Sequence, residues 1–207
     1  MHDIYVRDII EICGGKLLSG SLDLKLGDFC NDTRKIKTGD VYIGIKGEVF
    51  DGNKFYLDAI EKGANVCILD NVEDSYEYGE VTVILVDDTI KCIQELASYK
   101  REMYDIPVIA ITGSVGKTST KDMVASVVEQ KYKTCKTIGN YNNHIGVPLT
   151  ILSLSFLCFT FTLIIVFFSS IFNFILFNFK IYSIIYNIPY FFIIIYITCY
   201  IFYFTFC

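Results

Sequence analysis

Residues 110–121 read AITGSVGKTSTK and combine two glycines, two lysines and a run of hydroxyl side chains between a strand pattern and a helix pattern. Such a turn directs several backbone N–H groups and the positive end of a helix dipole at one point, where phosphate binds. Gly113 and Gly116 allow the backbone to come close to the phosphate, because glycine has no Cβ in the way. Lys117 is placed to bring a cation to the β- and γ-phosphates, and the Thr118 hydroxyl is suited to Mg²⁺.

The pattern is shorter than the full phosphate loop GxxxxGK[ST], because Ile111 occupies the position of the first glycine. A short glycine–lysine pattern also occurs in plain turns. The preceding strand and the following helix, with Met123, Val124, Val127 and Val128 expected on one apolar face, favour phosphate binding. The predicted nucleotide-binding residues are Gly113, Ser114, Val115, Gly116, Lys117, Thr118 and Ser119, with Lys117 as the catalytic cation and Thr118 as the metal ligand.

Upstream of the loop, strand and helix patterns alternate, which predicts an α/β fold with mainly parallel pairing. The expected helices cover 6–12, ending at Gly14-Gly15, then 53–63 with Asn53 as the cap, and a third from 89 with Ile90, Ile93, Leu96 and Met103 on one face. One expected strand begins at Lys16, and three more cover 41–45, 65–69 and 81–86.

The loop TGSVGKTSTK resembles the ATP-binding loop of the Mur ligases, which build the peptide stem of peptidoglycan precursors. Residues 31–64, NDTRKIKTGDVYIGIKGEVFDGNKFYLDAIEKGA, are similar to the family's amino-terminal UDP-sugar domain. Residues 139–150, GNYNNHIGVPLT, are similar to the segment that follows the phosphate-loop helix. The resemblance implies a UDP-sugar domain at 1–104, the start of a truncated ATPase domain at 105–154, and ATP and Mg²⁺ as cofactors.

The resemblance also implies residues that bind the sugar substrate. Thr33 and Arg34 match a hydroxyl–arginine pair, and a guanidinium suits a diphosphate because its donors form a planar fork. Lys46 and Gly47 match the turn after a strand. A solvated loop charge is the alternative for Arg34 and Lys46. The further candidates are Asn140, Asn142 and Asn143, with His144 beside them, and a turn of Asx hydrogen bonds is their alternative.

By resemblance, the expected reaction is ATP-dependent ligation of D-alanyl-D-alanine to a UDP-N-acetylmuramoyl tripeptide through an acyl phosphate. The alternatives are ligation of the third stem residue, a plain phosphate-loop nucleotide-binding module, and a membrane-anchored interaction protein. The family's acidic Mg²⁺ ligand, carbamylated lysine and third domain have no counterpart here, so we expect an inactive fragment. A cytoplasmic monomer is expected.

Composition changes abruptly at Ser155. From there to Cys207 the only charged side chain is Lys180, and Phe, Ile and Tyr predominate. This tail, 155–207, is long enough to cross a membrane twice, roughly to Asn178 and again from Ile181. Its lack of glycine and alanine favours instead a segment appended out of frame, and membrane association is expected only if the tail is genuine.

The rest of the chain is net acidic, with no cluster of Lys and Arg, which argues against a nucleic-acid partner. The cysteines show no CxxC pair or metal-ligand spacing, so we expect reduced, buried thiols.

Overall fold

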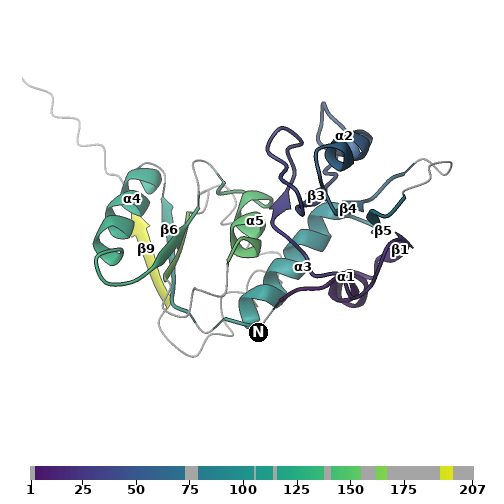
Figure 1. Ribbon diagram of the computed structural model, residues 1–207. Helices are drawn as coiled ribbons and strands as arrows, with labels where there is room; N and C mark the ends of the chain where they lie inside the picture. Colours follow the sequence, from purple (N-terminus) through teal and green to yellow (C-terminus); the bar gives the residue numbers. More distant parts are fainter. Residues whose placement is uncertain are drawn as a thin grey trace, which may run out of the picture. The chain divides into compact units, whose positions relative to one another are not determined.

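The computed structural model describes residues 3–72, 79–104, 106–113, 116–137, 141–154, 162–166 and 192–197. The chain divides into two compact units. Unit 1 holds residues 1–103 with 151–153, and unit 2 holds residues 104–150 with 154–207. Figure 1 shows the elements of both units.

Unit 1 is built on a five-stranded sheet in the order β1-β5-β4-β3-β2. Strands β2, β3, β4 and β5 run parallel to one another, whereas the edge strand β1 is antiparallel to β5. The strands are β1 (Lys16–Ser19), β2 (Phe29–Cys30), β3 (Val41–Ile43), β4 (Val66–Leu69) and β5 (Thr82–Leu85). The helices are α1 (Val6–Cys13), the 3-10 helix η1 (Gly52–Phe55), α2 (Tyr56–Glu61) and α3 (Thr89–Glu102). The predicted α/β class with mainly parallel pairing is confirmed.

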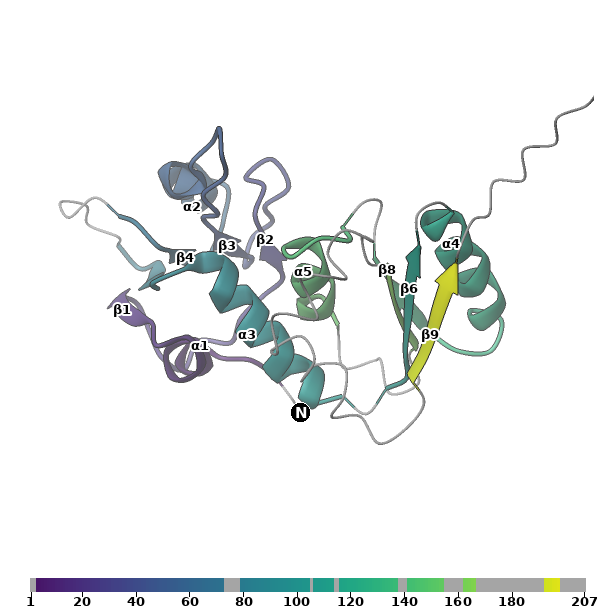
Figure 2. The ribbon, with the colours of Figure 1, turned by 180° about the vertical axis from the view of Figure 1, so that it is seen from behind.

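The central strands of unit 1 are buried on both faces, since every residue of β3 and β4 is buried. Side chains alternate between the faces of a strand, so β4 must be covered on both sides. Cys67 and Leu69 pack with Tyr56 and Ala59 of α2 on one face. Helices α1 and α3 cover the opposite face of the sheet, as Figure 2 shows. They pack against each other.

The ends of the unit 1 helices are set by local side chains and glycines. Helix α1 ends at Gly14, which has φ 65° in the left-handed region, as the sequence predicted. Asn53 is not the cap of the second helix. Asp51 instead caps the 3-10 helix η1, where its carboxylate accepts from the backbone N–H of Asn53, and α2 follows Phe55 with no side-chain cap. Helix α3 buries Ile93 and Leu96 but ends just before Met103.

Unit 2 contains a four-stranded sheet in the order β7-β8-β6-β9, and all of its strand pairs are parallel. The strands are β6 (Val108–Gly113), β7 (Thr134–Lys136), β8 (Thr162–Val166) and β9 (Phe192–Ile197), and the helices are α4 (Lys117–Val128) and α5 (Gly146–Leu152). Two strands come from the apolar tail.

The runs TLIIV and FIIIYI form these two strands, and continuous apolar runs of this kind suit a buried parallel strand as well as a membrane segment. The rest of the two expected membrane crossings lies outside the described residues. Within the described ranges, no helix is both long and apolar enough to span a bilayer.

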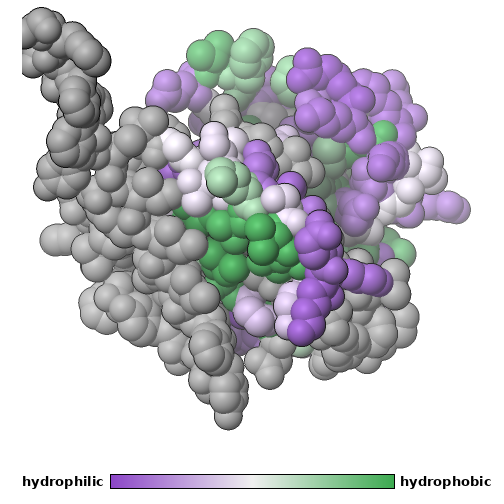
Figure 3. All heavy atoms as spheres, turned by 90° about the vertical axis from the view of Figure 1, so that its left-hand side faces the viewer, coloured by the Kyte–Doolittle hydropathy of each residue, from purple (hydrophilic) through white to green (hydrophobic). Residues whose placement is uncertain are grey.

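The buried face of α4 also differs from the expected one. Lys121 and Ala125 are its buried residues, and Val124 packs beside Ala125. Met123 and Val127 are 70% and 72% exposed, because positions two residues away from Ala125 are rotated by about 200° around a helix. Figure 3 views the molecule from the side on which α4 lies in Figure 1 and shows apolar side chains gathered on that face.

Candidate functional site

The predicted phosphate loop lies where β6 gives way to α4. Gly116 immediately precedes α4 and has φ 81°, a left-handed conformation that favours glycine. Gly116 has no side chain that could cap the helix, and the first-turn N–H groups of a helix are the donors that commonly bind phosphate. Lys117 is the first helical residue, and Thr118 and Ser119 are exposed beside it. Ser114 and Val115 lie outside the described residues.

Lys121, one turn beyond Lys117, is a buried cation for which the sequence motif predicted no role. Its side chain is 3% exposed, and its ammonium donates a 2.8 Å hydrogen bond to the backbone carbonyl of Thr137. Asp122 Oδ1 lies 3.7 Å away. Lys121 therefore joins α4 to the chain segment that leaves β7.

Two buried hydroxyls lie at the same sheet edge. Thr112 is the residue before Gly113 in β6, and Thr137 directly follows β7. Neither hydroxyl has a hydrogen-bond partner in the part of the chain that the structure describes. Because β6, β8 and β7 are parallel, their carboxyl ends share one edge, the usual place for a ligand in an open α/β sheet.

The asparagine-rich segment leads into α5. The side-chain oxygen of Asn143 accepts hydrogen bonds from the backbone N–H groups of Gly146, at 2.7 Å, and Ile145, at 3.2 Å. This is the Asx turn that the sequence left open as an alternative to substrate binding. Asn142 is half-buried beside it, and Asn140 lies outside the described residues.

The four sugar-site candidates of unit 1 follow the carboxyl ends of the adjacent parallel strands β2 and β3. Arg34 is 83% exposed and forms a fork with Asp32, with Nε 2.8 Å from Oδ1 and Nη2 2.9 Å from Oδ2. The side-chain hydrogen bond from Arg34 lowers the pKa of Asp32 to about 2. The Thr33 hydroxyl, after the ammonium of Lys62, helps to lower the pKa of Asp58 by a hydrogen bond.

Lys46 and Gly47 form one side of a closed loop after β3. The N–H of Gly47 donates to the carbonyl of Phe50 at 2.8 Å, and Lys46 forms an antiparallel bridge with Asp51. A Cβ on Gly52 would lie 2.5 Å from the carbonyl oxygen of Ile45, so this closure requires glycine. The loop therefore holds Lys46 at the edge of the sheet.

A buried polar network that sequence reasoning missed anchors this loop. Asn53 is 3% exposed, and its side-chain N–H groups donate to Asp51 at 2.8 Å and Asp70 at 2.6 Å. The Thr89 hydroxyl lies 3.3 Å from the Asp70 carboxylate and 3.2 Å from the carbonyl of Gly44. Polar residues directly after strands, as Asp70 follows β4, were the available signal.

Two family models match the chain. The Mur ligase family, catalytic domain, matches residues 30–101, and the Mur ligase middle domain matches residues 111–156. The chain belongs to the Mur ligase family. The expected resemblance is thus confirmed, and the two matches contain the sugar-site candidates of unit 1 and the phosphate loop of unit 2, respectively.

Similar Mur ligases share one activity in their names. The UDP-N-acetylmuramoyl-tripeptide–D-alanyl-D-alanine ligase of Synechocystis is 40% identical over 151 residues, which are 72% of this chain and 33% of that protein. The enzyme of the same name from Bacillus subtilis is 39% identical over 150 residues, with the same two shares. The chain spans about a third of the length of these relatives.

Solved Mur ligase structures have the same fold. A crystal structure of MurF from Acinetobacter baumannii matches with a TM-score of 0.70 and 27% identity, covering 82% of this chain and 36% of that one. MurF from Thermotoga maritima in complex with ADP matches with a TM-score of 0.59 and 28% identity, covering 69% of this chain and 32% of that one.

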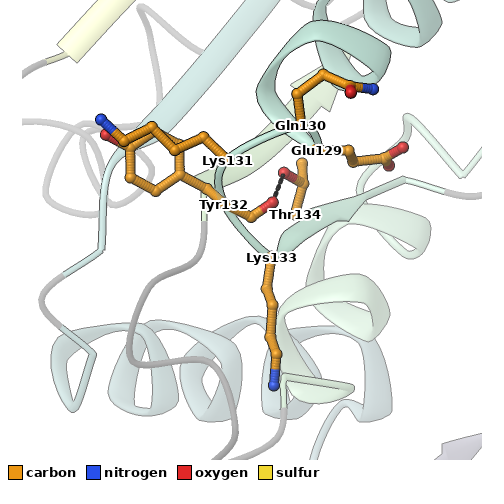
Figure 4. Close-up of a pocket in the computed structure, with 6 residues that line it drawn as sticks. All are labelled: Glu129, Gln130, Lys131, Tyr132, Lys133 and Thr134. Carbon is orange, nitrogen blue, oxygen red and sulfur yellow. Dashed lines mark hydrogen bonds between the residues drawn. The ribbon is translucent and has the colours of Figure 1, made fainter.

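A surface hollow in this Mur ligase chain is separate from the phosphate loop. It is lined by Glu129, Gln130, Lys131, Tyr132, Lys133 and Thr134, as Figure 4 shows. These residues connect the end of α4 to β7, whereas the phosphate loop precedes the start of α4. Among the residues that the structure describes, no group of three or more His, Cys, Asp or Glu side chains could hold a metal ion.

Proposed function

We propose that this chain contributes the UDP-sugar and ATP phosphate sites of a ligase that joins D-alanyl-D-alanine to a UDP-N-acetylmuramoyl tripeptide. The observation that carries the proposal is the start of α4 directly after the left-handed Gly116, with Lys117 and Thr118 at its first positions. The names of the relatives support the choice of substrates. Residues 1–104 take the sugar nucleotide, and 105–154 begin the ATP domain.

At the phosphate site, the first-turn N–H groups of α4 and the Lys117 ammonium oppose the negative charge of the β- and γ-phosphates. The Thr118 hydroxyl is placed as a ligand for Mg²⁺. When bound, ATP would supply the phosphoryl group that activates the tripeptide carboxylate, and Mg²⁺ would neutralise charge on its phosphates. Gly113, Ser114, Val115 and Ser119 complete the proposed loop.

At the sugar site, Arg34 and Lys46 are proposed to bind the diphosphate, with Thr33 and Gly47 shaping the edge of the sheet. In the ligand-free arrangement Asp32 occupies one fork of Arg34. A diphosphate must therefore use the remaining N–H groups or displace Asp32. Asn140, Asn142 and Asn143 are proposed to border the sugar-peptide, Asn143 through its side-chain amide group. We further propose a cytoplasmic monomer with no nucleic-acid partner.

The nucleotide part is tested by Lys117→Ala. We expect ATP affinity to fall by about 100-fold, because the cation that opposes the phosphates is lost while the backbone turn remains. Lys133→Ala, an exposed lysine beyond the far end of α4, is the matched control and should bind ATP as the parent chain does. Equal ATP affinity of the Lys117→Ala and parent chains, by isothermal titration, would contradict the assignment.

The sugar part is tested by titrating a UDP-muramoyl peptide into the chain. Arg34→Ala should weaken binding by about tenfold, because one charge-assisted contact to phosphate is removed. Lys35→Ala removes the neighbouring exposed charge and serves as the control. If the two substitutions weaken binding equally, Arg34 has no specific role and only the general charge of this edge matters.

A further inference from the structure

Two cysteines that belong to neither proposed site meet between α1 and α3. Cys13 is the last residue of α1, and Cys92 lies in the first turn of α3. The Cys13 thiol donates a hydrogen bond to the backbone carbonyl oxygen of Cys92, with the sulfur 3.5 Å from the oxygen. The pair joins positions 79 residues apart in the sequence.

The environments of the two thiols differ. Cys92 is 1% exposed, and its pKa is raised by the hydrogen bond to Cys13, by burial and by nearby carboxylates. It therefore stays a thiol, which reacts slowly with oxidants. Cys13 is only half-buried, so a small oxidant can reach its sulfur. Cys13 is consequently the thiol that reacts first.

We propose that Cys13 and Cys92 form an oxidative modification site, in which a hydroperoxide oxidises Cys13 and Cys92 then closes an intramolecular disulfide between α1 and α3. In the first step the Cys13 thiolate attacks hydrogen peroxide, forming a sulfenic acid and releasing hydroxide. In the second step the Cys92 sulfur attacks the sulfenic sulfur, an S–S bond forms, and the Cys92 proton leaves with the hydroxyl group as water. Two thiols are oxidised and one peroxide is reduced to two waters.

The other described cysteines of unit 1 lack this arrangement. Cys67 is fully buried, and burial raises its pKa to about 12. The Cys30 thiol donates to the backbone carbonyl of Asp32 at 3.3 Å, within its own loop. All five described cysteines are free in the structure, so the thiol pair is present in its reduced form. Because α1 and α3 already pack together, the disulfide links elements that are neighbours in the fold.

The test treats the whole chain with hydrogen peroxide, blocks the remaining thiols with N-ethylmaleimide, and identifies cross-linked peptides by mass spectrometry without reduction. We expect the Cys13–Cys92 peptide to exceed any other cysteine pair by about tenfold and to vanish on adding dithiothreitol. Its formation should also raise the urea midpoint of unit 1, because the cross-link restricts the unfolded chain.

Two variants separate the roles of the thiols. Cys92→Ala should leave Cys13 at the sulfenic acid stage, where dimedone labels it, whereas Cys13→Ala should abolish both the labelling and the cross-link. Cys67→Ala is the matched control and should cross-link as the parent chain does. Cross-links from Cys13 spread evenly over other cysteines, or oxidation of Cys13 to the sulfinic acid without any bond to Cys92, would overturn the proposal.

Discussion

Asn53 uses both polar atoms of its side chain to tie the Lys46–Asp51 loop to the end of β4. Its amide N–H groups bind two carboxylates, and its oxygen accepts from the backbone N–H of Asp70 at 3.1 Å. We expect Asn53→Ala to destabilise unit 1 by about 3 kcal/mol, since buried partners lose their hydrogen bonds. Urea denaturation measures this, and exposed Asn31→Ala should change it by less than about 0.5 kcal/mol. Equal urea midpoints for the two variants would show that Asn53 does not stabilise this loop.

Lys121 has a comparable role in unit 2, where it supplies the buried donor for the Thr137 carbonyl. We expect Lys121→Ala to destabilise unit 2 by about 2 kcal/mol, because the carbonyl loses its partner and the aliphatic stem loses its packing. Faster amide hydrogen exchange in residues 117–137 would report this loss. The control is Asp122→Ala, whose side chain is 53% exposed and whose ion pair with Lys121 is long, so exchange should stay near that of the parent chain.

At the scale of elements, α4 gives the clearest test of which face is buried. Ala125 is fully buried, whereas Val127 is 72% exposed. We expect Ala125→Leu to cost about 1–3 kcal/mol by overpacking, and Val127→Gln to stay within about 0.5 kcal/mol. Urea midpoints of the two variants decide between this face and the one expected from sequence. A larger loss of stability for Val127→Gln than for Ala125→Leu would indicate that the face expected from sequence is the buried one.

The sequence predicted elements well where one local rule dominated. Gly14 ended α1 as expected, and the β-branched runs became β4 and β5. It failed where distant contacts decide. The partner of Asn53 is Asp70, 17 residues away, and Lys121 is buried because Thr137 accepts from it. Neither partner is visible from helical spacing, which is why a charged residue was not expected on the inner face of α4.

For the whole molecule, the predicted site residues fall into two groups, one following parallel strands of the unit 1 sheet and the other following strands of the unit 2 sheet. Sequence motifs predicted both groups, because the residues around Arg34, Lys46 and Lys117 lie within a few positions of the end of a strand. What they could not give is the local pairing of the side chains. Arg34 pairs with Asp32, and Asn143 accepts from the backbone of its own turn. Both side chains had other possible partners, and the folded backbone decides between them.

The last prediction concerns catalysis by the 207-residue chain itself. Phosphoryl transfer depends on positioning and on groups that neutralise the developing charge, and the phosphate loop supplies only part of them. The chain spans about a third of the length of its relatives. We therefore expect no ATP-dependent phosphate release above background with UDP-muramoyl tripeptide and D-alanyl-D-alanine, while ATP binding still responds to Lys117→Ala. Turnover by the purified chain that Lys117→Ala abolishes would instead place all the necessary catalytic groups within these residues.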